Sequence, residues 1–108
     1  MRIDILGSEW HLETSNFIDD EKLKEYSGYT DDTVRKIVID SGEGRGNCEN
    51  YEQYRKQTIR HEIIHAYLYE SGLGDCWEHK VGQDETTVDW IAYQFPKLLK
   101  TFQEVDAL

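Results

Sequence analysis

One helical stretch constrains this chain more than any other feature. Residues 51–71 contain neither proline nor glycine, and Gly72 follows as a C-terminal stop. Apolar residues recur inside the stretch at helical spacing, which predicts one amphipathic helix that must pack against a core. These residues are Ile59, Ile63, Ala66 and Tyr67.

The same stretch carries the string His61-Glu62-Ile63-Ile64-His65. Two histidines four residues apart lie one turn apart on one helix face, where both can bind one zinc ion at about 2.0–2.1 Å per nitrogen. Glu62 can reach the open position of such a metal and take a proton from a water as the water attacks a carbonyl. The string predicts zinc-dependent hydrolysis, most often of a peptide bond. The alternative is an amphipathic helix with two ordinary histidines.

A third zinc ligand is available further along the chain. Glu85 lies 20 residues after His65, at the start of a second helical pattern, and Asp89 follows it on the same helix face. Glu85 can complete the coordination shell, and Asp89 can accept a hydrogen bond from the non-ligating nitrogen of a zinc histidine. The alternative is that both are solvated first-turn acids that stabilise a helix N-terminus. The apolar stripe of this second helix is Val88, Ile91, Ala92 and Phe95.

The pattern His61-Glu62-x-x-His65 followed by Glu85-x-x-x-Asp89 resembles the gluzincin zinc metallopeptidases, the thermolysin-like clan. The resemblance implies that His61, His65 and Glu85 are the ligands, Glu62 the general base and Asp89 the partner of His61. Over about residues 55–100 the chain is more closely similar to small phage- and prophage-encoded HExxH proteins. More distantly it resembles the ImmA/IrrE-type metallopeptidases.

The chain also departs from related patterns. The metzincin extension would need glycine and histidine where this chain has Leu68 and Ser71. The Glu-Ala-Asn segment of ImmA/IrrE-type proteins would place its glutamate on Thr87, which cannot replace a carboxylate ligand, so Glu85 is the expected ligand. Larger gluzincins supply a histidine or tyrosine that stabilises the oxyanion. Here the candidates are His79 and the tyrosines, each with an alternative structural role.

The chain is acidic, with a net charge of −10 and a pI near 4.7. This excess argues against binding to a nucleic-acid backbone, which needs Lys and Arg patches. The leading prediction is a zinc metallopeptidase acting on a peptide or protein. One alternative is a non-catalytic, zinc-stabilised phage regulator that binds a repressor or host factor. Another is an acidic decoy that mimics DNA. The oligomeric state is left open.

Two observations bear on the compartment. No apolar run reaches the roughly 18–20 residues of a membrane span, and residues 1–12 lack the basic-then-apolar pattern of a signal peptide. We therefore expect a cytoplasmic protein, in a bacterium or a phage-infected host cell, without a membrane partner. Cys48 and Cys76 are then expected to be free thiols unless the two sites meet. Cys48, in a glycine-rich loop, is also a candidate cap on the zinc.

The size of the chain predicts one domain over residues 1–108, and the resemblance implies that this domain is a minimal zincin-like one. Its class is α+β, with a small, mostly antiparallel sheet packed on the HExxH helix and a second C-terminal helix. We expect Pro96 to kink or restart the second helix, which then continues over 97–105. The other expected elements are strands at Arg2–Leu6, Trp10–Glu13 and Thr33–Asp40 and a helix at Asp19–Tyr26.

The strand Thr33–Asp40 has two alternative places. Resemblance to zincin-like folds puts it at the edge of the sheet, bordering a cleft above the HExxH helix. An extended peptide could add to such an edge through backbone hydrogen bonds. The run of Val34, Ile37, Val38 and Ile39 is equally compatible with a central core strand.

Overall fold

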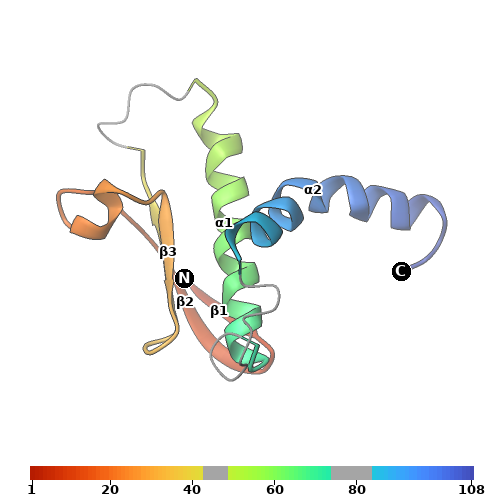
Figure 1. Cartoon of the computed structure of the whole chain (residues 1–108), viewed down its shortest axis with the longest axis horizontal. Coiled ribbons are helices and arrows are strands. Elements are labelled where there is room, and N and C mark those ends of the chain that lie inside the picture. The colour runs from red at the N-terminus through yellow and green to blue at the C-terminus, as the bar shows by residue number, and fades with distance from the viewer. Residues whose placement is uncertain (43–48, 74–83) are drawn as a thin grey trace.

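The computed structural model of the chain describes residues 1–42, 49–73 and 84–108, and it is α+β as predicted (Figure 1). A four-stranded sheet is followed by two long helices, and one short 3-10 helix (η1) interrupts the strands. In chain order the elements are β1 Arg2–Ile5, β2 Ser8–Ser15, η1 Glu21–Lys24, β3 Gly28–Asp31, β4 Lys36–Asp40, α1 Tyr51–Glu70 and α2 Glu85–Glu104.

The sheet has the strand order β1-β2-β4-β3. The two outer pairs, β1 with β2 and β3 with β4, are antiparallel, whereas the central pair β2 and β4 is parallel. The prediction of a mostly antiparallel sheet is thus confirmed. The first hairpin turns on Leu6 and Gly7, both at positive φ, which is the geometry that a two-residue turn between twisted strands requires.

The strand Thr33–Asp40 is shorter than predicted, and of its two alternative places the central one is confirmed and the edge one is wrong. Residues 32–35 form the turn that joins β3 to β4, because Asp31 pairs with Lys36. β4 therefore begins at Lys36 and lies between two neighbours, with Ile37, Val38 and Ile39 all buried. A strand covered on both faces is a continuous apolar run. Among the described residues β3, which the sequence did not predict, forms one edge of the sheet, and β1 forms the other.

Other expectations are met in part. The predicted helix at Asp19–Tyr26 contains only the single turn η1, capped by the Asp20 side chain, which accepts from the Lys22 N–H. Helix α1 ends as predicted before Gly72, whose φ of 87° permits the turn. Helix α2 runs through Pro96 without a restart. Tyr67, placed in the apolar stripe, is instead exposed at the side of α1.

Helix α1 packs across the sheet through one apolar cluster. Ala66 is fully buried there, and Ile59 and Ile63 pack at the margin, as their helical spacing predicts. The strands contribute Ile5, Trp10, Ile37 and Ile39 to the cluster. Burial of this face sets the orientation of α1 on the sheet. The side chains on the other face of α1 therefore lie toward β3.

Glu70 connects the last turn of α1 to the strands through hydrogen bonds. Its carboxylate accepts hydrogen bonds from Trp10 Nε1 at 2.8 Å and Ser8 Oγ at 3.2 Å, and it also pairs with the Arg35 guanidinium. The bond from Arg35, followed by the bond from Trp10, holds the pKa of Glu70 below its ordinary value. The carboxylate thus joins the first hairpin, the β3–β4 turn and α1.

Glu70→Gln is expected to destabilise the chain at neutral pH but much less in acid. Since folding lowers the pKa of Glu70, its contribution to stability is present above the ordinary value of 4.5 and is lost as the pH falls below it. Urea unfolding of both proteins at several pH values measures this. The two midpoints should differ near pH 7 and converge in acid. A difference between the two urea midpoints that does not change with pH would contradict the role of the Glu70 charge.

Candidate metal centre

Helix α1 places His61 and His65 side by side above the sheet. The helix begins after Asn50, whose side chain accepts from the Gln53 N–H at 3.2 Å, a regular N-cap. One turn separates the two histidines, and their Nε2 atoms lie 3.2 Å apart with ring centroids at 4.8 Å. Both rings are largely buried. The histidine pair therefore has the shared-face geometry that its spacing predicts.

Helix α2 brings its first turn to the same place. Asp84 caps the helix by accepting from the Thr87 N–H at 2.9 Å, so Glu85 is the first helical residue. The two oxygens of Glu85 lie 3.0 Å from His61 Nε2 and 3.0 Å from His65 Nε2. Thr87 contributes to the N-cap of α2 and is not one of the candidate metal ligands. All the ligand-type atoms of His61, His65 and Glu85 lie within 4.8 Å of one another.

The spacing of these three groups fits a small cation. Ligands held about 2.0–2.1 Å from a tetrahedral ion lie about 3.3 Å from one another, close to the 3.0–3.2 Å separations here. Two imidazole nitrogens and one carboxylate, with a fourth position left open, form a typical hydrolytic zinc set. The residues present therefore fit the ion that the sequence predicts.

Asp89 determines the state of the His61 ring. Its Oδ1 lies 2.7 Å from His61 Nδ1, and because a carboxylate only accepts, Nδ1 carries the hydrogen. In the neutral ring Nε2 then has a bare lone pair, which faces the Glu85 oxygen at 3.0 Å. Two lone pairs at that distance repel each other unless a hydrogen or a cation lies between them. A cation bound between Nε2 and the Glu85 oxygen would remove this repulsion.

Glu62 lies beside the cluster and is held from the opposite wall. Thr30 Oγ1, on β3, lies 3.0 Å from Glu62 Oε1 and 3.0 Å from the Glu62 carbonyl oxygen, and its one hydrogen is shared between these two acceptors. The other carboxylate oxygen, Oε2, lies 3.8 Å from His61 Nε2. Burial raises the pKa of Glu62, while the nearby His61 and the Thr30 bond oppose the rise. One oxygen is thus anchored and the other faces the histidines.

A cleft of about 400 Å³ opens next to these groups, between β3 and α1. A smaller hollow of about 240 Å³ continues past His65. Both are lined by Tyr26, Gly28, His61, Glu62 and Glu85. Gly28 allows the close approach of the walls, since a Cβ there would lie 2.9 Å from the Val38 carbonyl oxygen and 3.1 Å from Thr58 Cγ2.

Comparisons with protein-family models, with curated proteins and with solved structures gave no match to this chain. The family resemblance stated above therefore stays a prediction, and the site rests on its own geometry. In the part of the chain that the structure describes, neither helix is both long enough and apolar enough to cross a membrane. His79, Cys48 and Cys76 lie outside the described residues.

Arg60 joins the two ligand-bearing helices through a backbone group that Pro96 leaves open. Proline has no N–H, so the Ala92 carbonyl lacks the donor that residue 96 would normally provide four residues later. Arg60 Nε donates to that oxygen at 2.7 Å. Arg60 is adjacent to His61, and Ala92 lies on the turn after Asp89. The sequence patterns did not predict this contact, although a proline inside a helix signals an unpaired carbonyl.

Arg60→Met should cost about 1–2 kcal/mol of stability, the usual penalty for an acceptor left without its donor. In a Pro96→Ala background the cost should shrink, because an alanine at that position restores the N–H to the Ala92 carbonyl. Chemical denaturation of the four proteins gives the coupling energy between the two positions. Equal costs of Arg60→Met in both backgrounds would contradict the pairing.

Proposed function

We propose that this chain is a zinc-dependent metallopeptidase. The observation that carries the proposal is the convergence of His61, His65 and Glu85, from two helices, beside the buried carboxylate of Glu62. Nitrogen and carboxylate donors in this number favour zinc among the divalent metals, subject to availability in the cell. When bound, the ion would supply a Lewis acid that polarises a water and a carbonyl.

The chain's own residues would then perform the proton transfers. Glu62 Oε2 faces the ligand set and takes a proton from the attacking water, then returns it to the leaving amine. Thr30 holds Oε1 and so fixes the direction of the carboxylate. Asp89 holds the His61 ring in the tautomer that leaves Nε2 free to bind a cation. The raised pKa of Glu62 suits a group that must both accept and release a proton.

The edge strand β3 offers a place for a peptide substrate. It pairs only with β4 among the described strands, and its residues Gly28, Tyr29 and Thr30 line the hollow beside the histidines. An extended peptide bound along this edge would gain backbone hydrogen bonds and would pass the ligand set. This role, first expected for Thr33–Asp40, is assigned here to β3.

Metal content is the experiment that tests the proposal. The chain is purified without a histidine tag, and bound metal is measured by mass spectrometry for wild type and Glu85→Ala. About one zinc per wild-type chain is expected, with loss or weakening in the variant. Glu104→Ala, at the other end of α2, is the matched control and should retain zinc. A wild-type chain without metal, whose melting temperature zinc does not raise, would refute the proposal.

A second function keeps zinc but not catalysis. The C-terminal half of α2 exposes large apolar side chains that hydrolysis does not need, among them Phe95 and Phe102. A zinc-stabilised interaction protein would use such a surface, and the ion would serve to hold α2 against α1. The two functions separate on Glu62→Gln, since an interaction protein should keep its biological activity in that variant.

A further inference from the structure

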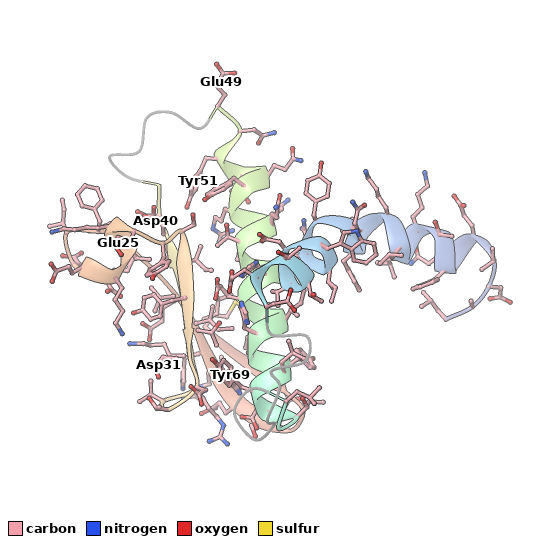
Figure 2. The ribbon with its side chains drawn as sticks, viewed as in Figure 1. Glu25, Asp31, Asp40, Glu49, Tyr51 and Tyr69 are labelled. Atoms are coloured by element: carbon pink, nitrogen blue, oxygen red, sulfur yellow. The ribbon has the colours of Figure 1, made fainter. Side chains whose placement is uncertain are left out.

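The apolar stripe of α2 extends beyond the part that packs on α1. Val88 and Ala92 are fully buried against the body, whereas Phe95 is 47% and Phe102 43% exposed on the same side of the helix. Leu98 and Leu99 lie between them and are partly exposed. Figures 1 and 2 show this half of α2 projecting away from the sheet and α1. A helix face with this spacing normally lies against a second element.

The sequence of the projecting half reads the same in both directions at all positions of residues 95–102 except Pro96 and Thr101. Residues 95–102 read Phe-Pro-Lys-Leu-Leu-Lys-Thr-Phe. In an antiparallel pair of such helices with a two-fold axis between positions 98 and 99, each Phe95 lies opposite Phe102 of the other copy. Each Leu98 likewise lies opposite Leu99. An interface between identical chains requires this self-complementarity.

Charge also favours a second copy of the chain. Lys97 and Lys100 are the only charged residues between positions 90 and 103, in a chain whose net charge is −10. Both lie off the apolar stripe, and Lys97 contacts the ring of Tyr93 on the outer side of the helix. Two copies can therefore join their stripes without bringing acids together. The lysines on the outer side of the helix add no like-charge repulsion within the contact.

From these observations we propose that two copies of the chain associate through the projecting halves of α2, packed antiparallel about the Leu98–Leu99 midpoint. Two half-exposed phenylalanines and two leucines offer a few hundred Å² per copy, less than the roughly 800 Å² per partner of a stable interface. The dimer is accordingly weak and reversible. Glu85 and Asp89, at the opposite end of α2, stay outside the contact.

Sedimentation equilibrium of the full chain tests the association. Between about 5 µM and about 500 µM, a range that brackets weak affinities, the wild-type mass should rise from 12.7 kDa toward twice that value. Phe95→Ser/Phe102→Ser should stay at 12.7 kDa. The control is Tyr93→Ser, which removes an equally exposed aromatic ring from the opposite side of α2 and should behave as wild type. Circular dichroism verifies that each variant is folded.

Disulfide trapping tests the antiparallel geometry and does not depend on the serine variant. In a Cys48→Ser/Cys76→Ser background, Phe95→Cys/Phe102→Cys should form covalent dimers under mild oxidation. Either single cysteine variant should not, because its two copies would lie about 10 Å apart along the axis, beyond disulfide reach. A wild-type chain that stays monomeric, which would leave the stripe to a different protein, overturns the proposal. So does a dimer that survives in the folded Phe95→Ser/Phe102→Ser variant, or efficient trapping through a single cysteine.

Discussion

Glu62→Gln should abolish peptide hydrolysis while zinc binding is retained. The amide keeps the size of the side chain and its bond to Thr30, but it cannot accept the proton of the attacking water. Removal of a positioned general base typically lowers the rate by about 10²–10⁴-fold. Cleavage of a fluorogenic peptide library, with metal content measured on the same samples, tests this. Full activity in zinc-loaded Glu62→Gln protein would eliminate the mechanism.

Substitutions of Thr30 test how much activity depends on the hydrogen bond that holds the Glu62 carboxylate. Thr30→Val keeps the shape of the side chain but removes the donor 3.0 Å from Glu62 Oε1, so we expect a lower kcat, unchanged zinc content and little change in KM. Thr30→Ser keeps the hydroxyl and should retain most of the activity. If the valine and serine variants are equally slow, the effect comes from packing on β3 and not from the hydrogen bond.

Removal of zinc should lower the melting temperature by about 15–30 °C, because zinc binding is coupled to folding. An ion held by both helices binds only the folded chain, and at free zinc near 1,000 times its Kd this linkage contributes about 4 kcal/mol. For a chain of this size each kcal/mol moves the melting temperature by about 4–8 °C. Differential scanning calorimetry with saturating zinc and after chelation gives the shift directly.

His65→Ala serves as the control for that shift. The variant loses a ligand, so its melting temperature should hardly respond to zinc or chelator. His11→Ala removes a half-exposed histidine on β2, far in sequence from the cluster, and should respond as wild type. A wild-type melting temperature that is unaffected by chelation would mean that the ion, if bound, does not join α1 to α2.

Much of the site could be predicted because it follows from local rules. The spacing of His61 and His65 needs only a helix, and the helix is marked by its apolar stripe and by Gly72. The start of α2 is marked by Asp84, an N-cap residue directly before Glu85. What the sequence left open was whether the two helices meet. The structure places Glu85 and Asp89 at the histidines.

The strands and the cross-helix contacts depend on tertiary structure and were harder to predict. β3 has four residues and begins with glycine, so the two strand-forming residues Tyr29 and Thr30 are too few to make a recognisable pattern. The strand forms because β4 supplies its hydrogen bonds. For β4 the resemblance to zincin-like folds favoured an edge, whereas its apolar run also allowed the central place that the structure shows, and its sequence could not decide between them. No sequence pattern marks Thr30 as a site residue, since its role depends on which side chain faces it across the cleft.

The hydrogen bond from Arg60 to the Ala92 carbonyl has a consequence for sequence evolution. Pro96 and Arg60 are coupled although 36 positions separate them. Pro96 has no N–H to donate to the Ala92 carbonyl, and the Arg60 guanidinium donates to that carbonyl in its place. Chains descended from a common ancestor should therefore change the two positions together. Where the proline is replaced, selection on the arginine should relax, and residue 60 should vary like any other partly exposed position on the helix.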